Sequence, residues 1–348
     1  MIQDTEAIPP APPPVAYVPT QHIAEAMRLA ECERRIMTIP CADLTDSLFD
    51  FLWSRDDPYP ILVTQANQGL QLDWDPPFFS KTFFNYPCQV QNCSTGEEFG
   101  SSVDQLFSRY GLCSNVGESW CIKVLHVHRH PYYQPTYIDF QDWPPAEDFK
   151  TVYPYCILCN DLLRTVPVPD VLRPDGCRNA ISYFLAGRAK PDLGQFIFNR
   201  YIFNRYSFWF SNIFSGPKMY AATEDDQGVG STKLHGDVAD AFNLCTFTDR
   251  KDGYALWTIF LRKDAPKVAE YILELNLGSG NPIYQQQTQL TATHLDDLYR
   301  KKGVRPFVIR QGCGDMVLIP AGDPHQVRHY RSLLKGLLIC IPTCILGQ

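Results

Sequence analysis

Short apolar runs separated by turn-forming residues recur along the last third of the chain. They predict strands at residues 241–246, 254–261, 306–310, 316–319, 325–330 and 333–341. Two stretches with helical periodicity, 266–275 and 292–302, interrupt this series. Many short strands joined by turns rich in glycine, proline and aspartate are typical of a β-barrel or a two-sheet jelly roll. We therefore expect a mainly β fold with flanking helices.

The pattern upstream is mixed. Residues 21–36 combine helix-forming side chains with a rough apolar stripe, which predicts a helix. Residues 61–63 have the character of a buried strand, and residues 103–110 have the character of a short helix. Residues 142–175 are rich in proline and acidic side chains, so we expect a long surface connection with a short helix there.

These patterns divide the chain into three predicted regions. Residues 1–20 hold six prolines and little that could pack, which predicts a disordered tail. Residues 21–190 form a helical and mixed region expected to pack on the barrel, and residues 191–348 form the β-rich core. Within that core, residues 195–216 contain the sequence Ile-Phe-Asn-Arg-Tyr twice. This aromatic segment is either an ordinary strand pair or an insertion, and we favour an insertion.

Composition narrows the class of protein. The 348 residues include 31 Lys and Arg against 38 Asp and Glu, which gives a net charge of −7. This balance argues against a protein that grips nucleic-acid phosphates and suits a basic peptide partner. The chain lacks a long apolar run and a signal-like N-terminus, so neither a membrane span nor secretion is expected. The 13 scattered cysteines fit reduced thiols inside a cell.

The segment most informative about chemistry runs from Gly230 to Asp237. Residues two positions apart in a strand point to the same face, so His235 and Asp237 can aim an imidazole and a carboxylate at one point. This pair makes up two-thirds of the 2-His-1-carboxylate triad that holds Fe(II) and leaves coordination positions open. The third ligand must come from a strand that is remote in sequence but adjacent in the sheet.

His325 is the best candidate for the third ligand. It follows an apolar strand and a turn rich in proline and glycine, which would place it at the mouth of a barrel. His329 could compete, but it lacks the turn that aims the side chain. We interpret five further histidines as ordinary hydrogen-bonded residues: His22, His126, His128, His130 and His294.

An iron site of this class needs a co-substrate that brings a carboxylate into an apolar pocket. A buried carboxylate requires a cation and a hydroxyl as partners. Lys335 lies within an apolar run and is a candidate for the cation, although an edge-strand lysine that discourages aggregation explains it equally well. Thr232 could supply the hydroxyl, and Asn243 could hydrogen-bond the same ligand.

Longer motifs around these residues carry a family resemblance. The strongest segments are residues 230–243, which include Thr-Lys-Leu-His-Gly-Asp, and residues 319–327, which include Gly-Asp-Pro-His-Gln-Val. Shorter matches occur at residues 59–63, 73–76, 142–149 and 191–194. In these motifs the sequence resembles the JmjC (jumonji C) oxygenases, most closely the hairless-like branch of histone lysine demethylases.

The resemblance implies a double-stranded β-helix, a cupin-like jelly roll, that binds Fe(II) and uses 2-oxoglutarate and O2. The implied iron ligands are His235, Asp237 and His325. Thr232 and Lys335 match positions suited to the 2-oxoglutarate carboxylate. Because the predicted strand that follows the His-x-Asp pair offers no inward lysine, Lys335 becomes the favoured partner.

The implied reaction is oxidative demethylation of a methylated lysine in a histone tail, in the nucleus. Succinate, CO2 and formaldehyde would be released. Two alternatives remain open at this point, namely a JmjC protein hydroxylase and a catalytically silent chromatin-binding module. They remain open because the surfaces that select a substrate leave no recognisable signature in the sequence. The target lysine, its methylation state and the oligomeric state are equally open.

Overall fold

A computed structural model describes residues 17–91, 98–108, 155–166, 168–170, 173, 218–222, 232–237, 240–278, 280–330 and 333–340. The aromatic segment 195–216 and most of the predicted disordered tail lie outside these residues. The predicted domain boundaries therefore remain predictions. Across the described ranges, no helix is both long and apolar enough to cross a membrane.

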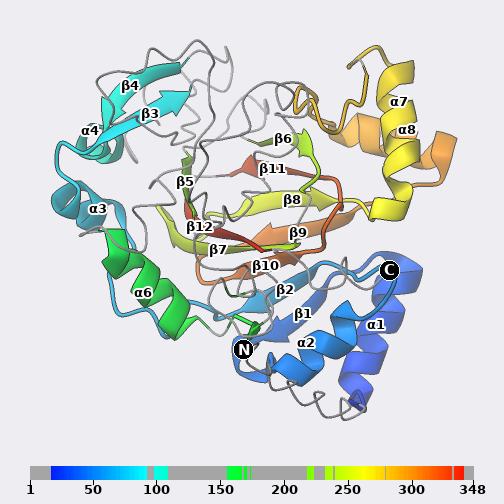
Figure 1. The fold of residues 1–348 in the computed structure, drawn as a ribbon. Coiled ribbons are helices and arrows are strands. Elements are labelled where there is room, and N and C mark those ends of the chain that lie inside the picture. The colour runs from blue at the N-terminus through cyan, green and yellow to red at the C-terminus, as the bar shows by residue number, and fades with distance from the viewer. Residues whose placement is uncertain are drawn as a thin grey trace, which may run out of the picture.

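The larger sheet has six strands in the order β1-β2-β10-β7-β12-β5. Their bounds are β1 Met37–Pro40, β2 Ile61–Thr64, β5 Lys218–Ala222, β7 Asp240–Thr248, β10 Met316–Ile319 and β12 Leu333–Cys340. β1 and β2 pair in parallel, and the other neighbours are antiparallel. The N-terminal part of the chain thus adds two strands to a sheet made otherwise by the C-terminal part (Figure 1).

The smaller sheet has four antiparallel strands in the order β6-β11-β8-β9. Their bounds are β6 Thr232–His235, β8 Ala255–Ile259, β9 Phe307–Gln311 and β11 His325–His329. β9 alternates buried and exposed residues, as expected of a strand with one face toward the core and one toward water. A separate pair, β3 Pro87–Gln91 and β4 Glu98–Ser102, forms a small two-stranded sheet.

One apolar core lies between the two main sheets. Ala241, Cys245 and Val317 of the larger sheet share a buried cluster with Trp257 and Val327 of the smaller one. The two sheets therefore face each other, and side chains from both fill the space between them. This arrangement confirms a β-rich fold with flanking helices. The jelly-roll connectivity itself remains a prediction.

Helices from the N-terminal part cover the other face of the larger sheet. They are α2 Asp46–Trp53, α3 Pro76–Thr82, α4 Val103–Ser108 and α6 Tyr155–Thr165. The first helix, α1 Gln21–Glu33, contributes Ile23 to the cluster on this face and Ala30 to the cluster between the sheets. Buried residues of α2, α3, α4 and α6 share a cluster with Val63 of β2 and with Phe242 and Leu244 of β7. The larger sheet is thus buried on both faces, which explains its near-continuous apolar strands.

One of the predicted helices ends earlier than the sequence pattern suggested. The helix expected over residues 21–36 ends at Glu33, because Arg34 adopts a left-handed conformation (φ 54°) and donates its backbone N–H to Leu29 O. The helix expected over 103–110 is described as far as Ser108. The remaining strand and helix predictions of the C-terminal third are confirmed with small shifts at their ends.

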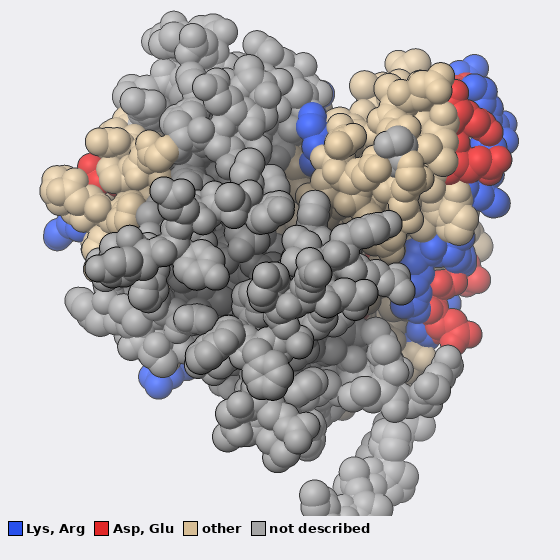
Figure 2. Space-filling view, turned by 45° about the horizontal axis from the view of Figure 1, so that its top comes forward, with Lys and Arg blue, Asp and Glu red and all other residues tan. Residues whose placement is uncertain are grey.

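The 3-10 turn η6 Arg262–Asp264 leads into α7 Ala265–Glu274, and α8 Ala292–Lys302 follows. α7 and α8 flank the end of the smaller sheet (Figure 1). Charged side chains gather along their outer side, at the right of Figure 2. Lys302 Nζ lies 2.9 Å from Glu270 and 2.7 Å from Glu274, and Lys301 Nζ lies 2.8 Å from Asp297. The lysines on the outer side of α7 and α8 are therefore paired with carboxylates of the same two helices.

A single buried carboxylate attaches α6 to the loop before α3. Asp161 accepts hydrogen bonds from Gln71 N at 2.8 Å, Leu72 N at 3.1 Å and Trp74 Nε1 at 2.8 Å. A carboxylate that accepts three N–H groups can be buried because the bonds replace its hydration.

We predict that Asp161→Asn lowers the free energy of unfolding by about 2–3 kcal/mol, because the amide places N–H groups against N–H donors. Urea denaturation measures the effect. The exposed Asp296→Asn on α8 is the matched control and should change stability by less than about 0.5 kcal/mol. Equal stability of the two variants would contradict the anchoring role of Asp161.

Candidate metal centre

The centre is positioned by the pairing of β6 with β11. In this antiparallel pair, His235 stands directly opposite His325. Directly opposed residues project from the same face of a sheet, so both imidazoles leave the sheet on the same side. Their ring centroids lie 4.3 Å apart. The register thus brings together two histidines that are far apart in the sequence.

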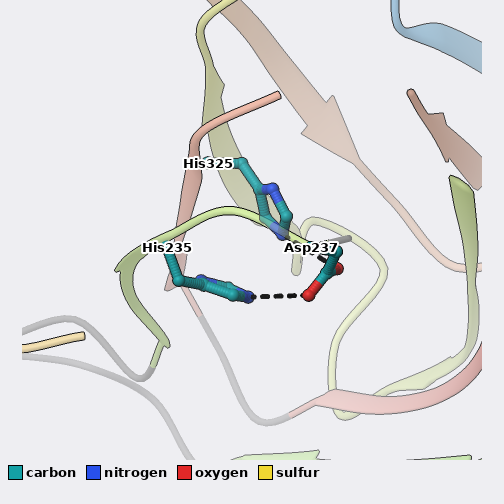
Figure 3. Close-up of side chains that lie close together, drawn as sticks. All are labelled: His235, Asp237 and His325. Carbon is teal, nitrogen blue, oxygen red and sulfur yellow. Dashed lines mark ion pairs between the residues drawn. The ribbon is translucent and has the colours of Figure 1, made fainter. Parts of the chain in front are cut away.

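Asp237 completes the group just beyond the end of β6 (Figure 3). Its Oδ1 lies 3.8 Å from His235 Nε2, and its Oδ2 lies 3.7 Å from His325 Nε2. One ligand atom from each residue lies within 4.8 Å of the others, a spacing that could hold a metal ion. In the described part of the chain this is the one such group of His, Cys, Asp and Glu residues. The sequence-predicted triad therefore converges in space.

Backbone carbonyl groups orient both imidazoles. His235 Nδ1 lies 2.8 Å from Lys233 O, and His325 Nδ1 lies 2.9 Å from Asp323 O. A carbonyl oxygen can only accept a hydrogen bond, so each Nδ1 donates its proton and each Nε2 presents a lone pair toward the shared point. Metal-ligating histidines are commonly held in this way. Two imidazoles and one carboxylate fit the 2-His-1-carboxylate donor set of non-haem Fe(II).

The turn between β10 and β11 is tied to the loop that carries Asp237. Gly322 donates its N–H to Asp237 O at 2.7 Å. Its φ of 79° lies in the left-handed region that favours glycine. Because this turn leads directly into His325, the bond links the third candidate ligand to the loop of the second.

Two buried carboxylates fix the same turn. Asp240 accepts a hydrogen bond from Ala321 N at 2.7 Å, and Asp323 accepts one from Arg262 N at 2.8 Å. Burial raises the pKa of Asp240 to about 6, although the Ala321 N–H, the Trp53 side chain and Arg262 act in the opposite direction. Burial also raises the pKa of Asp323 well above its ordinary value.

A β-bulge in β6 determines the face on which Thr232 lies. Along β11, His325 pairs with His235 and Val327 pairs with Thr232, so the register shifts between these pairs. Val327 and His325 lie two positions apart and share a face. Thr232 therefore shares the face of His235 despite the odd spacing between them. Simple alternation would have placed Thr232 on the opposite face.

Asn243 lies in the middle of β7 and is buried. Ala241, Asn243 and Cys245 follow one another at intervals of two residues along β7, so their side chains lie on the same face of the strand. Ala241 and Cys245 belong to the cluster between the sheets, so Asn243 faces that space as well. Its Oδ1 accepts a hydrogen bond from Gln311 Nε2 at 3.3 Å. Gln311 Oε1 in turn accepts the indole N–H of Trp257 at 2.8 Å.

Gln311 links Asn243 to Trp257, whose ring lies next to His325. The sequence alone did not indicate this role of Gln311. The Trp257 ring that it holds lies 5.8 Å from the His325 ring, centroid to centroid. Asn243 is thus attached to one of the triad histidines through two intermediate side chains. A glutamine at the end of a strand has no sequence signal that distinguishes this role from a surface position.

Lys335 lies in β12, where its backbone pairs with Cys245 of β7 and Tyr220 of β5. β12 therefore has a neighbouring strand on each side. The interpretation of Lys335 as an edge-strand lysine is wrong for this reason. Its side chain lies outside the described part of the structure.

The other histidines behave in different ways. His294 Nδ1 accepts the Thr291 N–H in a capping box at the start of α8, which confirms an ordinary hydrogen-bonding role. His329 lies in β11 opposite Ala255 and is not part of the metal-binding group. His22 is an exposed residue of α1. His126, His128 and His130 lie outside the described residues.

The fold and the site together define a β-rich protein with a candidate mononuclear metal centre of two histidines and one aspartate. No family model matches the chain. Comparison with curated proteins does find relatives across most of its length. It is 26% identical to lysine-specific demethylase 3A of Rattus norvegicus over 351 residues, which cover 87% of this chain and 26% of the relative.

Two further relatives extend the comparison. Lysine-specific demethylase 3 of Drosophila melanogaster is 25% identical, with 87% of this chain and 37% of the relative covered. The probable JmjC domain-containing histone demethylation protein 2C of Homo sapiens is 23% identical, with 87% and 12% covered. These matches confirm the resemblance and show that the chain is a relative of the JmjC histone demethylases. It spans about a quarter of the length of the demethylase 3A proteins that it matches.

We predict that the unmodified chain loses stability relative to the Asp240→Asn variant as pH rises. The pKa of Asp240 is about 6 in the folded state and 3.8 ordinarily. The unfolded chain therefore releases the proton more readily, and the folded state loses stability as pH rises from about 4 to about 6. The difference should grow by about 2 kcal/mol between pH 4 and pH 7.

Urea denaturation of both proteins in the presence of a chelator, at several pH values, measures this difference. Asp296→Asn, which removes an exposed carboxylate of α8, is the control against which the pH dependence of Asp240→Asn is read. A pH-independent difference for Asp240→Asn would contradict the assigned burial effect.

Proposed function

We propose that the chain is an Fe(II)- and 2-oxoglutarate-dependent dioxygenase that demethylates lysine in histone tails. The observation that carries this proposal is the convergence of His235, Asp237 and His325 in a relative of proteins named lysine-specific demethylases. The products would be succinate, CO2, formaldehyde and the demethylated lysine.

In this proposal, the two Nε2 atoms and the Asp237 carboxylate are the protein ligands of iron. Bound iron would supply the oxidising chemistry that hydroxylates an N-methyl group with O2 and 2-oxoglutarate. The role of the chain is to hold the ligands in a fixed orientation, with Nε2 of each imidazole turned toward the iron. The carbonyl groups of Lys233 and Asp323 serve that role, because each fixes the proton on Nδ1.

Thr232, Lys335 and Asn243 are the proposed contacts of 2-oxoglutarate. The bulge in β6 supports Thr232, because it places this residue on the face of the triad. The interior position of β12 supports Lys335, because an interior strand has no free edge for a lysine to protect. Asn243 shares the face between the sheets, where its amide already contacts Gln311.

We extend the proposal to the fold and the substrate. The two facing sheets, with the ligands on β6 and β11, support a double-stranded β-helix formed largely by residues 191–348. The net charge of −7 suits a basic histone tail. A histone substrate would place the protein in the nucleus.

The direct test is a turnover assay on a panel of methylated histone peptides with Fe(II), 2-oxoglutarate and O2. Mass spectrometry follows the peptides, and succinate and formaldehyde are measured in parallel. The proposal expects both products and a loss of 14 Da per methyl group removed (CH2 being about 14 Da). Succinate without formaldehyde would favour a hydroxylase. Neither product from folded, iron-loaded protein would favour a silent chromatin-binding module.

We predict that His235→Ala or Asp237→Ala abolishes iron-dependent succinate production, because each variant removes one of three ligands. Far-ultraviolet circular dichroism should show a retained fold. His22→Ala, an exposed histidine on α1, is the matched control and should retain activity. Unchanged turnover in either ligand variant would refute the assignment of the metal site.

We also predict that Lys335→Ala raises the 2-oxoglutarate concentration needed for half-maximal turnover by about 10-fold or more, because a buried carboxylate would lose its cation. Turnover measured against 2-oxoglutarate concentration tests this expectation. Lys301→Ala removes a surface lysine from the outer side of α8 and serves as the control, so its 2-oxoglutarate requirement should match that of the unmodified chain. An unaltered requirement in Lys335→Ala would exclude this lysine as the co-substrate contact.

A further inference from the structure

The strand that carries His235 is paired with only one other strand of its sheet, namely β11. β6 has four residues, lies at the edge of the smaller sheet and contains a bulge. Short, irregular edge strands specify their register weakly. His235 ends this strand, and Asp237 follows it. Further contacts must therefore fix two of the three proposed ligands.

Those contacts come from residues 280–290, which we call the strap. The strap lies in the connection between α7 and α8. Thr288 O accepts the N–H of Leu234, the residue before His235, at 2.8 Å. Because Thr288 is not part of β11, this bond gives β6 a backbone partner besides its one neighbouring strand.

The strap is also clamped to the other ligand strand. Gln326, the residue after His325, accepts the Leu290 N–H through its Oε1 at 2.8 Å. Its Nε2 donates to Leu290 O at 2.7 Å. Gln326 and Leu290 are each 3% exposed, so water has little access to these bonds. One side-chain amide thereby satisfies both backbone polar groups of the buried Leu290.

Apolar packing holds the strap against the same strands. Leu234 of β6 shares a buried cluster with Ile283 and Leu290 of the strap and with Val268 of α7 and Leu298 of α8. Leu234 and Gln326 are the neighbours of the two histidines, and neighbouring residues in a strand project from opposite faces. The strap therefore supports β6 and β11 from the side opposite the imidazoles.

From this arrangement we propose that Gln326 is a positioning residue for the metal centre. Its amide clamps the strap to β11, and the strap in turn holds β6, so that His235 remains opposite His325. This inference rests on the proposed function of the triad as a metal site. It assigns a role to a side chain that faces away from the metal.

The test compares Gln326→Met with the unmodified chain and with Gln287→Met. Methionine keeps the side-chain length and loses both hydrogen bonds. Gln287 is an exposed residue of the strap, so its variant is the matched control. Binding of Co(II), a spectroscopic probe for the Fe(II) site, is titrated under conditions where circular dichroism shows all three proteins folded.

Gln326→Met should bind Co(II) about 10–100-fold more weakly, with an altered visible absorption spectrum. Gln287→Met should match the unmodified chain. Unchanged affinity and spectrum in folded Gln326→Met would overturn the positioning role, because a purely structural residue changes stability alone. Absence of Co(II) binding by the unmodified chain is a different result and would refute the proposed metal site itself.

A second measurement needs no folded methionine variant. Coupling between two sites is reciprocal, so a strap that positions the ligands must itself be stabilised by the metal. Amide hydrogen exchange of Leu290 in the unmodified chain should slow when Co(II) binds. Gln326→Glu, which keeps the acceptor and loses the donor, should show a smaller slowing. Exchange of Leu290 that is unaffected by metal would overturn the proposal.

Discussion

The pairing of β6 with β11 is the constraint on which the candidate site depends. Because directly opposed residues in an antiparallel pair share a face, one register places His235 and His325 side by side. A slip of one residue in either strand would send one imidazole to the opposite face. The chemistry proposed for this protein therefore depends on a local register that a short edge strand cannot secure alone.

Most of the groups that secure this register are ordinary structural groups. Backbone carbonyls orient the imidazoles, and the Gly322 N–H links the turn before His325 to the loop of Asp237. Asp240 and Asp323 accept backbone N–H groups around the same turn, and burial raises the pKa of both carboxyl groups. The strap supports the strands from behind. The ligands can thus be held in place before any metal binds.

The sequence was sufficient to single out the three candidate ligands that the structure brings together, and to predict most of the strands around them. The two-residue alternation of a strand predicts that His235 and Asp237 point to one place, although in the structure Asp237 lies just beyond the end of β6. The turn before His325 marks a strand end. The bulge in β6 could not be predicted, because its register is set by contacts between distant segments. β1 and α2 went unpredicted for a related reason, since their burial depends on the sheet and helices around them. Gln311 and Gln326 bind residues that are distant in the sequence, so their roles could not be predicted either.

The fold, the triad and the similarity to demethylases all point to one property of the chain, namely that the triad binds one ferrous ion. X-ray absorption spectroscopy of the chain loaded anaerobically with one equivalent of Fe(II) tests this claim most directly. The account predicts one tightly bound iron per chain with a signature of two imidazole ligands, and loss of one imidazole in His325→Ala. Iron that does not bind, or binds with the same signature in that variant, would contradict it.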